Sequence, residues 1–182
     1  IFYVKENFNI EKFLIKLEEA TYSLNYVNTN IKFIDFLGNT DNDLGVIKVG
    51  LCYLLFMEQF PLIKINSKLQ NNIVDNLVRT ATPHQGKINY INTQSLMLLF
   101  LLKKIHKFPK LDEYIILLIK TQKDNGLLVH GFNSYLMEDP FEYDILHSCF
   151  GLIILLEYQI LKKYKEITSL ASAPAIFAPK KH

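Results

Sequence analysis

The sequence predicts an all-α fold, and three observations lead to this prediction. Apolar residues recur three and four residues apart through most of the chain, as they do on one side of a helix. The apolar runs are too long for strands and lack the alternation that a half-buried strand shows. Two kinds of helical segment also alternate along the chain: outer helices, apolar on one side, and inner helices, apolar on nearly all sides.

The predicted outer helices cover residues 7–20, 66–79 and 111–120. Each carries its apolar residues on one stripe and its charged residues on the other side. Residues 25–43 between the first outer and the first inner helix are rich in Asn, Asp and Thr, which predicts a loop, with residues 31–37 forming a short helix or turn packed on the core. The order along the chain is outer, inner, outer, inner, outer, inner.

The predicted inner helices begin near Gly45, Thr93 and Asp144. This spacing of about fifty residues is typical of helical-hairpin repeats. An α/α toroid arranges such hairpins in two concentric rings, with the inner helices around a substrate cavity. We therefore expect an α/α toroid of about three hairpins, as a partial or open ring. An ordinary helix bundle is the alternative.

Length and composition predict one domain over residues 1–168, followed by an extended, proline-containing tail at residues 169–182. With 49% hydrophobic and 21% charged residues, the chain is not of the disordered class. Apolar runs such as residues 96–102 are too short for a membrane span, so we expect a soluble protein. The net charge of +2 comes without a cluster of Lys, Arg and aromatic residues, which argues against nucleic-acid binding.

Two cysteines, Cys52 and Cys149, both fall inside inner-helix patterns. We expect both to be buried and reduced, which indicates a reducing compartment such as the cytoplasm.

His147 is a candidate metal ligand at the start of the last inner helix. Asp144 is a good N-cap residue, and a helix that begins after it places His147 in the first turn. There the helix dipole disfavours the imidazolium, and metals bind the neutral ring. The alternative is a histidine that only fills space at a helix start.

The segment Asp144-Ile-Leu-His147-Ser-Cys-Phe150-Gly151, preceded by Thr121-Gln122-Lys-Asp124-Asn-Gly126 and Gly131-Phe132, resembles the last catalytic repeat of protein prenyltransferase β subunits. The resemblance is specific over residues 115–156, and the D-x-L-H-x-x-F-G wording is closest to the geranylgeranyl types. It implies a cytoplasmic enzyme with a helical α subunit as heterodimer partner. Such an enzyme transfers an isoprenoid from its diphosphate to a C-terminal cysteine of a protein. It also implies that His147 binds the zinc that activates the thiolate.

The chain departs from the family at its other sites. Residues 91–95 stand at the place of the D-x-C zinc motif and contain neither Asp nor Cys, so one imidazole is left for a metal that takes three protein ligands. His84 and His130 could add ligands only if the fold brings them to His147. No catalytic side chain is assigned.

The resemblance gives two candidates for diphosphate binding, Lys87 and Tyr90, where the family has G-R-x-x-K. Asp43 stands where the family has a phosphate donor. A set of inner-helix aromatics would line a lipid cavity in a toroid, or else fill the core: Tyr53, Phe56, Phe100 and Phe150. The alternative function is a non-catalytic α/α-toroid module that binds a lipid or a protein partner.

Overall fold

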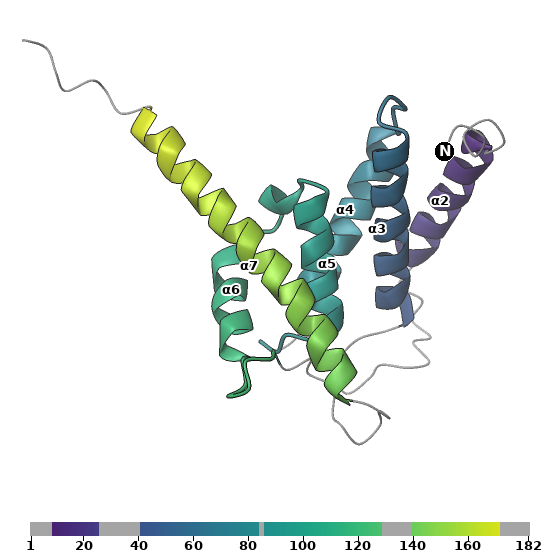
Figure 1. Cartoon of the computed structure of the whole chain (residues 1–182). Helices are drawn as coiled ribbons and strands as arrows, with labels where there is room; N and C mark the ends of the chain where they lie inside the picture. Colours follow the sequence, from purple (N-terminus) through teal and green to yellow (C-terminus); the bar gives the residue numbers. More distant parts are fainter. Residues whose placement is uncertain (1–8, 26–40, 84–85, 129–139, 172–182) are drawn as a thin grey trace, which may run out of the picture.

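The structure is a computed structural model that describes residues 9–25, 41–83, 86–128 and 140–171 (Figure 1). In these segments the regular secondary structure is helical, which confirms the all-α prediction. The helices in chain order are α2 (Ile10–Asn25), α3 (Asp41–Gln59), α4 (Ser67–Ala81), α5 (Tyr90–Leu101), the 3₁₀ helix η1 (Ile105–Lys107), α6 (Leu111–Lys120) and α7 (Pro140–Ala171).

The helices alternate between two rows. The inner row consists of α3, α5 and α7, with α5 packed against both of the others. Behind it, α4 packs against α2, α3 and α5, while α6 contacts α5 and α7 through side chains. The three inner helices start at the same end of the molecule and run in the same general direction (Figure 1). The alternation predicted from the sequence is therefore present.

All three inner helices begin three or four residues earlier than the sequence indicated, α5 at Tyr90. Helix α3 starts at Asp41, inside the predicted loop, and α7 starts at Pro140. Proline fits the first turn of a helix because its missing N–H has no partner there anyway. The prediction of Asp144 as the N-cap is therefore wrong, and His147 is not in the first turn. The predicted helix at residues 31–37 lies outside the described residues.

Helix α7 is also longer at its other end. It continues to Ala171, so the first three residues of the predicted tail are helical. Residues 172–182 lie outside the described residues. One segment of α7, Ile145–Glu166, is long and apolar enough to cross a membrane by length and composition alone. A core helix of a soluble protein can have the same length and composition, so this one segment does not overturn the expectation of a soluble protein, which stays a prediction.

The core lies between the two rows. Leu77, Leu96, Leu99 and Leu118 are fully buried there. Tyr53, Phe56 and Phe100 are also buried, so these aromatics pack in the core, while Phe150 is half-buried.

Helix α3 approaches its neighbours closely at Gly50. A Cβ atom at this position would lie 3.0 Å from Leu77 Cδ2 of α4 and 3.2 Å from Leu98 Cδ1 of α5. Such contacts are tighter than ordinary van der Waals packing. Because glycine has no Cβ atom, α3 can pack closely against α4 and α5 at this position.

Candidate functional site

His147 lies at the junction of three helices. It is the eighth residue of α7, and its side chain has no solvent exposure. Its Nε2 atom lies 2.8 Å from Thr93 Oγ1 of α5, and the same oxygen lies 3.0 Å from the Tyr114 hydroxyl of α6. We call His147, Thr93 and Tyr114 the buried triad. It joins the inner helices α5 and α7 to the outer helix α6.

The triad has one consistent proton arrangement. Thr93 Oγ1 donates its single proton to the Asn89 carbonyl oxygen, 3.0 Å away. A hydroxyl that has donated its proton can only accept further hydrogen bonds, so it accepts from the Tyr114 O–H and from the His147 Nε2–H. This arrangement makes His147 the Nε2–H tautomer, with the ring's lone pair on Nδ1. That Nδ1 atom is buried as well.

Burial also affects the phenol of the triad. Desolvation raises the pKa of the fully buried Tyr114 well above its ordinary value, and the hydrogen bond with Thr93 opposes this only in part. Tyr114 is therefore neutral and a donor at physiological pH, which agrees with the arrangement above.

The start of α5 contains residues 91–95, the stretch compared above with the D-x-C motif, and its polar residues cap the helix. The Asn89 side chain accepts from Asn92 N at 2.9 Å, and Asn89 N donates to Asn92 Oδ1 at 3.1 Å. Asn92 Nδ2 also donates to the Thr80 carbonyl oxygen of α4 at 2.8 Å. These reciprocal bonds form a capping box tied to the preceding helix. The residues here hold α5 in place and offer no metal-binding side chain.

The two predicted diphosphate-binding residues lie near this same helix start. Lys87 is exposed in the turn before α5. Tyr90 is half-buried, its hydroxyl accepts from Gln94 Nε2 at 2.8 Å, and its ring packs against Phe150 of α7 at 5.7 Å between centroids. Tyr90 thus contacts α7, three residues from His147, while Lys87 remains a surface cation.

The turn at residues 121–128 docks on the start of α7. Gly126 has a φ of +87°, a conformation that favours glycine, and the turn closes with Lys123 N donating to the Leu127 carbonyl oxygen at 2.7 Å. Leu128 N then donates to Ser148 Oγ at 2.8 Å. A Cβ atom at Gly151 would lie only 2.2 Å from Leu128 Cδ1. Gly151 therefore makes room for this turn.

The described residues do not fit the zinc site that the resemblance implies. They contain no group of three His, Cys, Asp or Glu side chains placed to hold a metal ion. In the tautomer assigned above, His147 Nε2 donates to Thr93 and cannot bind a metal, so the only lone pair of the ring is on the buried Nδ1 atom. His84, His130 and the side chain of Asp43 lie outside the described residues.

The inner row presents a second candidate site, an apolar surface. The less buried residues of each inner helix recur three or four residues apart, so each helix has one open stripe, on the side away from the outer row. We call these stripes together the inner face. Its apolar members are Leu51, Cys52 and Leu55 on α3, Met97 and Leu101 on α5, and Cys149, Leu152, Leu156 and Ile160 on α7.

The inner face corrects the prediction made for the cysteines. Cys52 and Cys149 are both exposed free thiols, not buried ones. The pattern correctly indicated apolar helices, but one side of each remains open.

Sequence reasoning missed Thr93 and Tyr114 as partners of His147. The polar residues in the first half of α5, Thr93 among them, were the available signal, because a buried hydroxyl needs a partner. Searches with the whole chain found no match among family models, curated proteins or solved structures.

Proposed function

We propose that the chain is a non-catalytic helical-hairpin module, built like part of a prenyltransferase β ring, which binds an isoprenoid chain on its inner face. The observation that carries this proposal is the row α3, α5 and α7, whose neighbouring open stripes carry the apolar side chains named above, beside polar ones such as Lys48, Gln94 and Gln159. In a toroid these are the stripes that surround the substrate. Contiguous exposed apolar surface of this kind marks binding sites in soluble proteins.

The α7 part of the inner face contributes most of the apolar area. The leucines at 152 and 156 are 58% and 52% exposed, and Ile160 is 63% exposed. Covering the open half of one such side chain stabilises a complex by about 1 kcal/mol. Two of them together account for about 2 kcal/mol, or roughly a 30-fold change in Kd.

The test is a calorimetric titration with farnesol, an uncharged isoprenoid alcohol, below its aggregation concentration. We expect saturable binding by the wild type and a loss of about 30-fold in Leu152→Gln/Leu156→Gln. Leu62→Gln is the matched control, because Leu62 is 95% exposed in the turn after α3 and lies off the inner face. Equal weakening by the control, or no binding to the wild type, would refute the isoprenoid proposal.

Two other occupants of the inner face give different results. Association of two copies would appear as a dimer in analytical ultracentrifugation, and insertion into a bilayer as co-sedimentation with neutral vesicles. If the wild type does not bind farnesol but dimerises or binds vesicles, and Leu152→Gln/Leu156→Gln abolishes that behaviour, the face belongs to that occupant. This outcome overturns the proposal.

The second candidate is the transferase itself, a cytoplasmic heterodimer with a helical α subunit that acts on an isoprenoid diphosphate and a protein C-terminal cysteine. The parallel inner row favours it, because Tyr90 and His147 both lie near the end where α5 and α7 begin. Helix N-termini at one end of a row favour a phosphate group. Its zinc ligands would have to come from segments outside the described residues.

Metal analysis separates the two candidates. Stoichiometric zinc in protein purified with its helical partner, lost in His147→Ala but retained in a matched buried variant such as Ile73→Val on α4, would favour the transferase. Metal-free protein that still binds farnesol would favour the module.

A further inference from the structure

A cleft of about 550 Å³ lies on the side of α7 opposite the inner face. It is bounded by residues 105–113, which contain η1 and the start of α6, and by the C-terminal half of α7. Its volume is in the range of sites for small organic ligands. Buried or half-buried apolar residues form part of its lining: Ile105, Phe108, Leu111 and Leu161.

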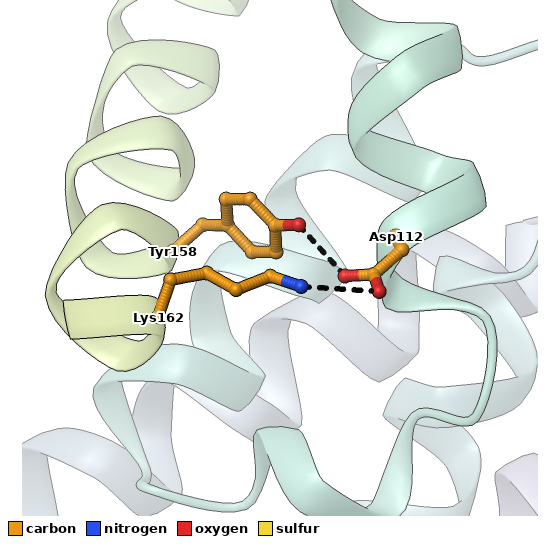
Figure 2. A network of polar contacts seen from close by, with 3 residues as sticks. All are labelled: Asp112, Tyr158 and Lys162. Carbon is orange, nitrogen blue, oxygen red and sulfur yellow. Dashed lines mark hydrogen bonds and ion pairs between the residues drawn. The ribbon is translucent and has the colours of Figure 1, made fainter. Parts of the chain in front are cut away.

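Asp112, Tyr158 and Lys162 form a hydrogen-bonded cluster at this cleft (Figure 2). The Tyr158 hydroxyl donates to Asp112 Oδ1 at 2.7 Å, and Lys162 Nζ donates to Asp112 Oδ2 at 3.2 Å. Each carboxylate oxygen therefore already accepts a hydrogen bond. Lys162 Nζ also lies 5.2 Å from the centroid of the Tyr158 ring, a second contact that favours this position of the ammonium group.

The charges around the cleft are mostly positive. Lys110 and Lys165 line it together with Lys162, against Asp112 and Glu113. Lys110 pairs with Glu113 only at 3.9 Å, while Lys162 has further N–H groups besides the one it gives to Asp112. The lining therefore has a positive balance of one charge beside an apolar floor.

We propose that this cleft binds a small phosphate monoester with an apolar tail, its phosphate against Lys162 and Lys165 and its tail against Phe108 and Leu161. Lysine ammonium groups bind phosphate as point charges, and the apolar floor selects against free phosphate. Asp112 orients Lys162 and competes with the ligand for it. This site is independent of the proposed isoprenoid binding on the inner face.

The test is a titration of ¹⁵N-labelled protein with hexyl phosphate at low ionic strength, followed by NMR. We expect saturable shifts at residues 105–113 and 158–165, with inorganic phosphate and hexanol each binding at least about tenfold more weakly. Shifts confined to the inner face, or no saturation at concentrations on the order of 10 mM, would overturn the assignment.

Single substitutions then distinguish a charge-binding site from a structural contact. Lys162→Met and Lys165→Met should each weaken hexyl phosphate binding by about fivefold to tenfold, and Asp112→Asn should strengthen it. Lys163→Met is the matched control, because Lys163 is exposed on α7 but does not line the cleft. If it weakens binding as much as Lys162→Met, the effect is general charge and the proposal fails.

Tyr158→Phe tests whether the hydrogen bond between α6 and α7, and not the Lys162 ammonium group, controls ligand binding. It removes a hydrogen bond between α6 and α7 but no charge. We expect hexyl phosphate affinity to change less than twofold, within the scatter of such measurements. A loss as large as that of Lys162→Met would show that the helix contact, not the ammonium group, controls binding, and would overturn the proposal.

Discussion

Thr93→Val tests whether the buried triad holds the inner row together. Valine keeps the shape of threonine and creates no cavity, but removes the oxygen that accepts from Tyr114 and His147. Both donors are at most 1% exposed, so water cannot replace the lost acceptor. A buried polar group that loses its partner costs about 1–3 kcal/mol, so we expect a loss of about 2–5 kcal/mol in the free energy of unfolding.

The assay is thermal unfolding followed by circular dichroism. For a chain of this length each kcal/mol lowers Tm by about 2–4 °C, which gives a decrease of roughly 4–20 °C. Thr82→Val is the matched control, because Thr82 Oγ1 also donates to a carbonyl oxygen four residues earlier but the residue is exposed. We expect it to change stability by less than about 0.5 kcal/mol. Equal Tm shifts for the two variants would refute the role assigned to the triad.

A double-mutant cycle sharpens this test. Tyr114→Phe removes the phenol that Thr93→Val leaves without its acceptor, so the double variant should cost less than the sum of the two single changes. We expect a coupling of about 1 kcal/mol or more. Strict additivity would mean that the 3.0 Å contact between the two hydroxyls contributes nothing measurable.

Three further predictions concern other parts of the chain. In equilibrium urea unfolding, Gly151→Ala should be less favourable in the wild type than in Leu128→Ala by about 1–3 kcal/mol. The new Cβ would lie 2.2 Å from Leu128 Cδ1, while the helix-propensity gain of alanine is the same in both backgrounds. The α7 donors, the tyrosine hydroxyl first and then the lysine, lower the pKa of Asp112. The stability that these hydrogen bonds give to the folded protein is therefore fully present above the unfolded Asp pKa of about 3.9, and it is lost as pH falls through the lower folded pKa. The difference in stability between wild type and Asp112→Asn should therefore shrink below about pH 4. Finally, Cys52 and Cys149 should both react with a thiol reagent in the folded protein, and bound farnesol should slow both reactions.

Helical periodicity predicted much of the fold because it depends only on local sequence. The predicted outer helix at residues 111–120 coincides with α6, and the predicted helix at 66–79 lies within two residues of α4. Helix starts were less predictable. At Asp41 and Pro140 the helix begins among residues that are equally common in loops, and packing against the rest of the fold decides between the two.

The site was less predictable than the fold. Apolar residues all round a helix indicated that α3 and α7 are enclosed, but the pattern cannot say which segment encloses them. The structure leaves Cys52 and Cys149 exposed on the open stripes for this reason. The contact of His147 with Thr93 spans 54 residues of sequence, and no local pattern encodes such a distance.

The segment that carries the family resemblance can be explained by packing alone. His147 binds Thr93 of α5, Ser148 accepts from the 121–128 turn, Phe150 packs on Tyr90, and Gly151 makes room for Leu128. Each of these residues fixes α7 against its neighbours, and none of these contacts requires a metal or a substrate. These contacts account for His147, Ser148, Phe150 and Gly151 without transfer chemistry, and this is why the proposed function rests on the inner face and not on His147.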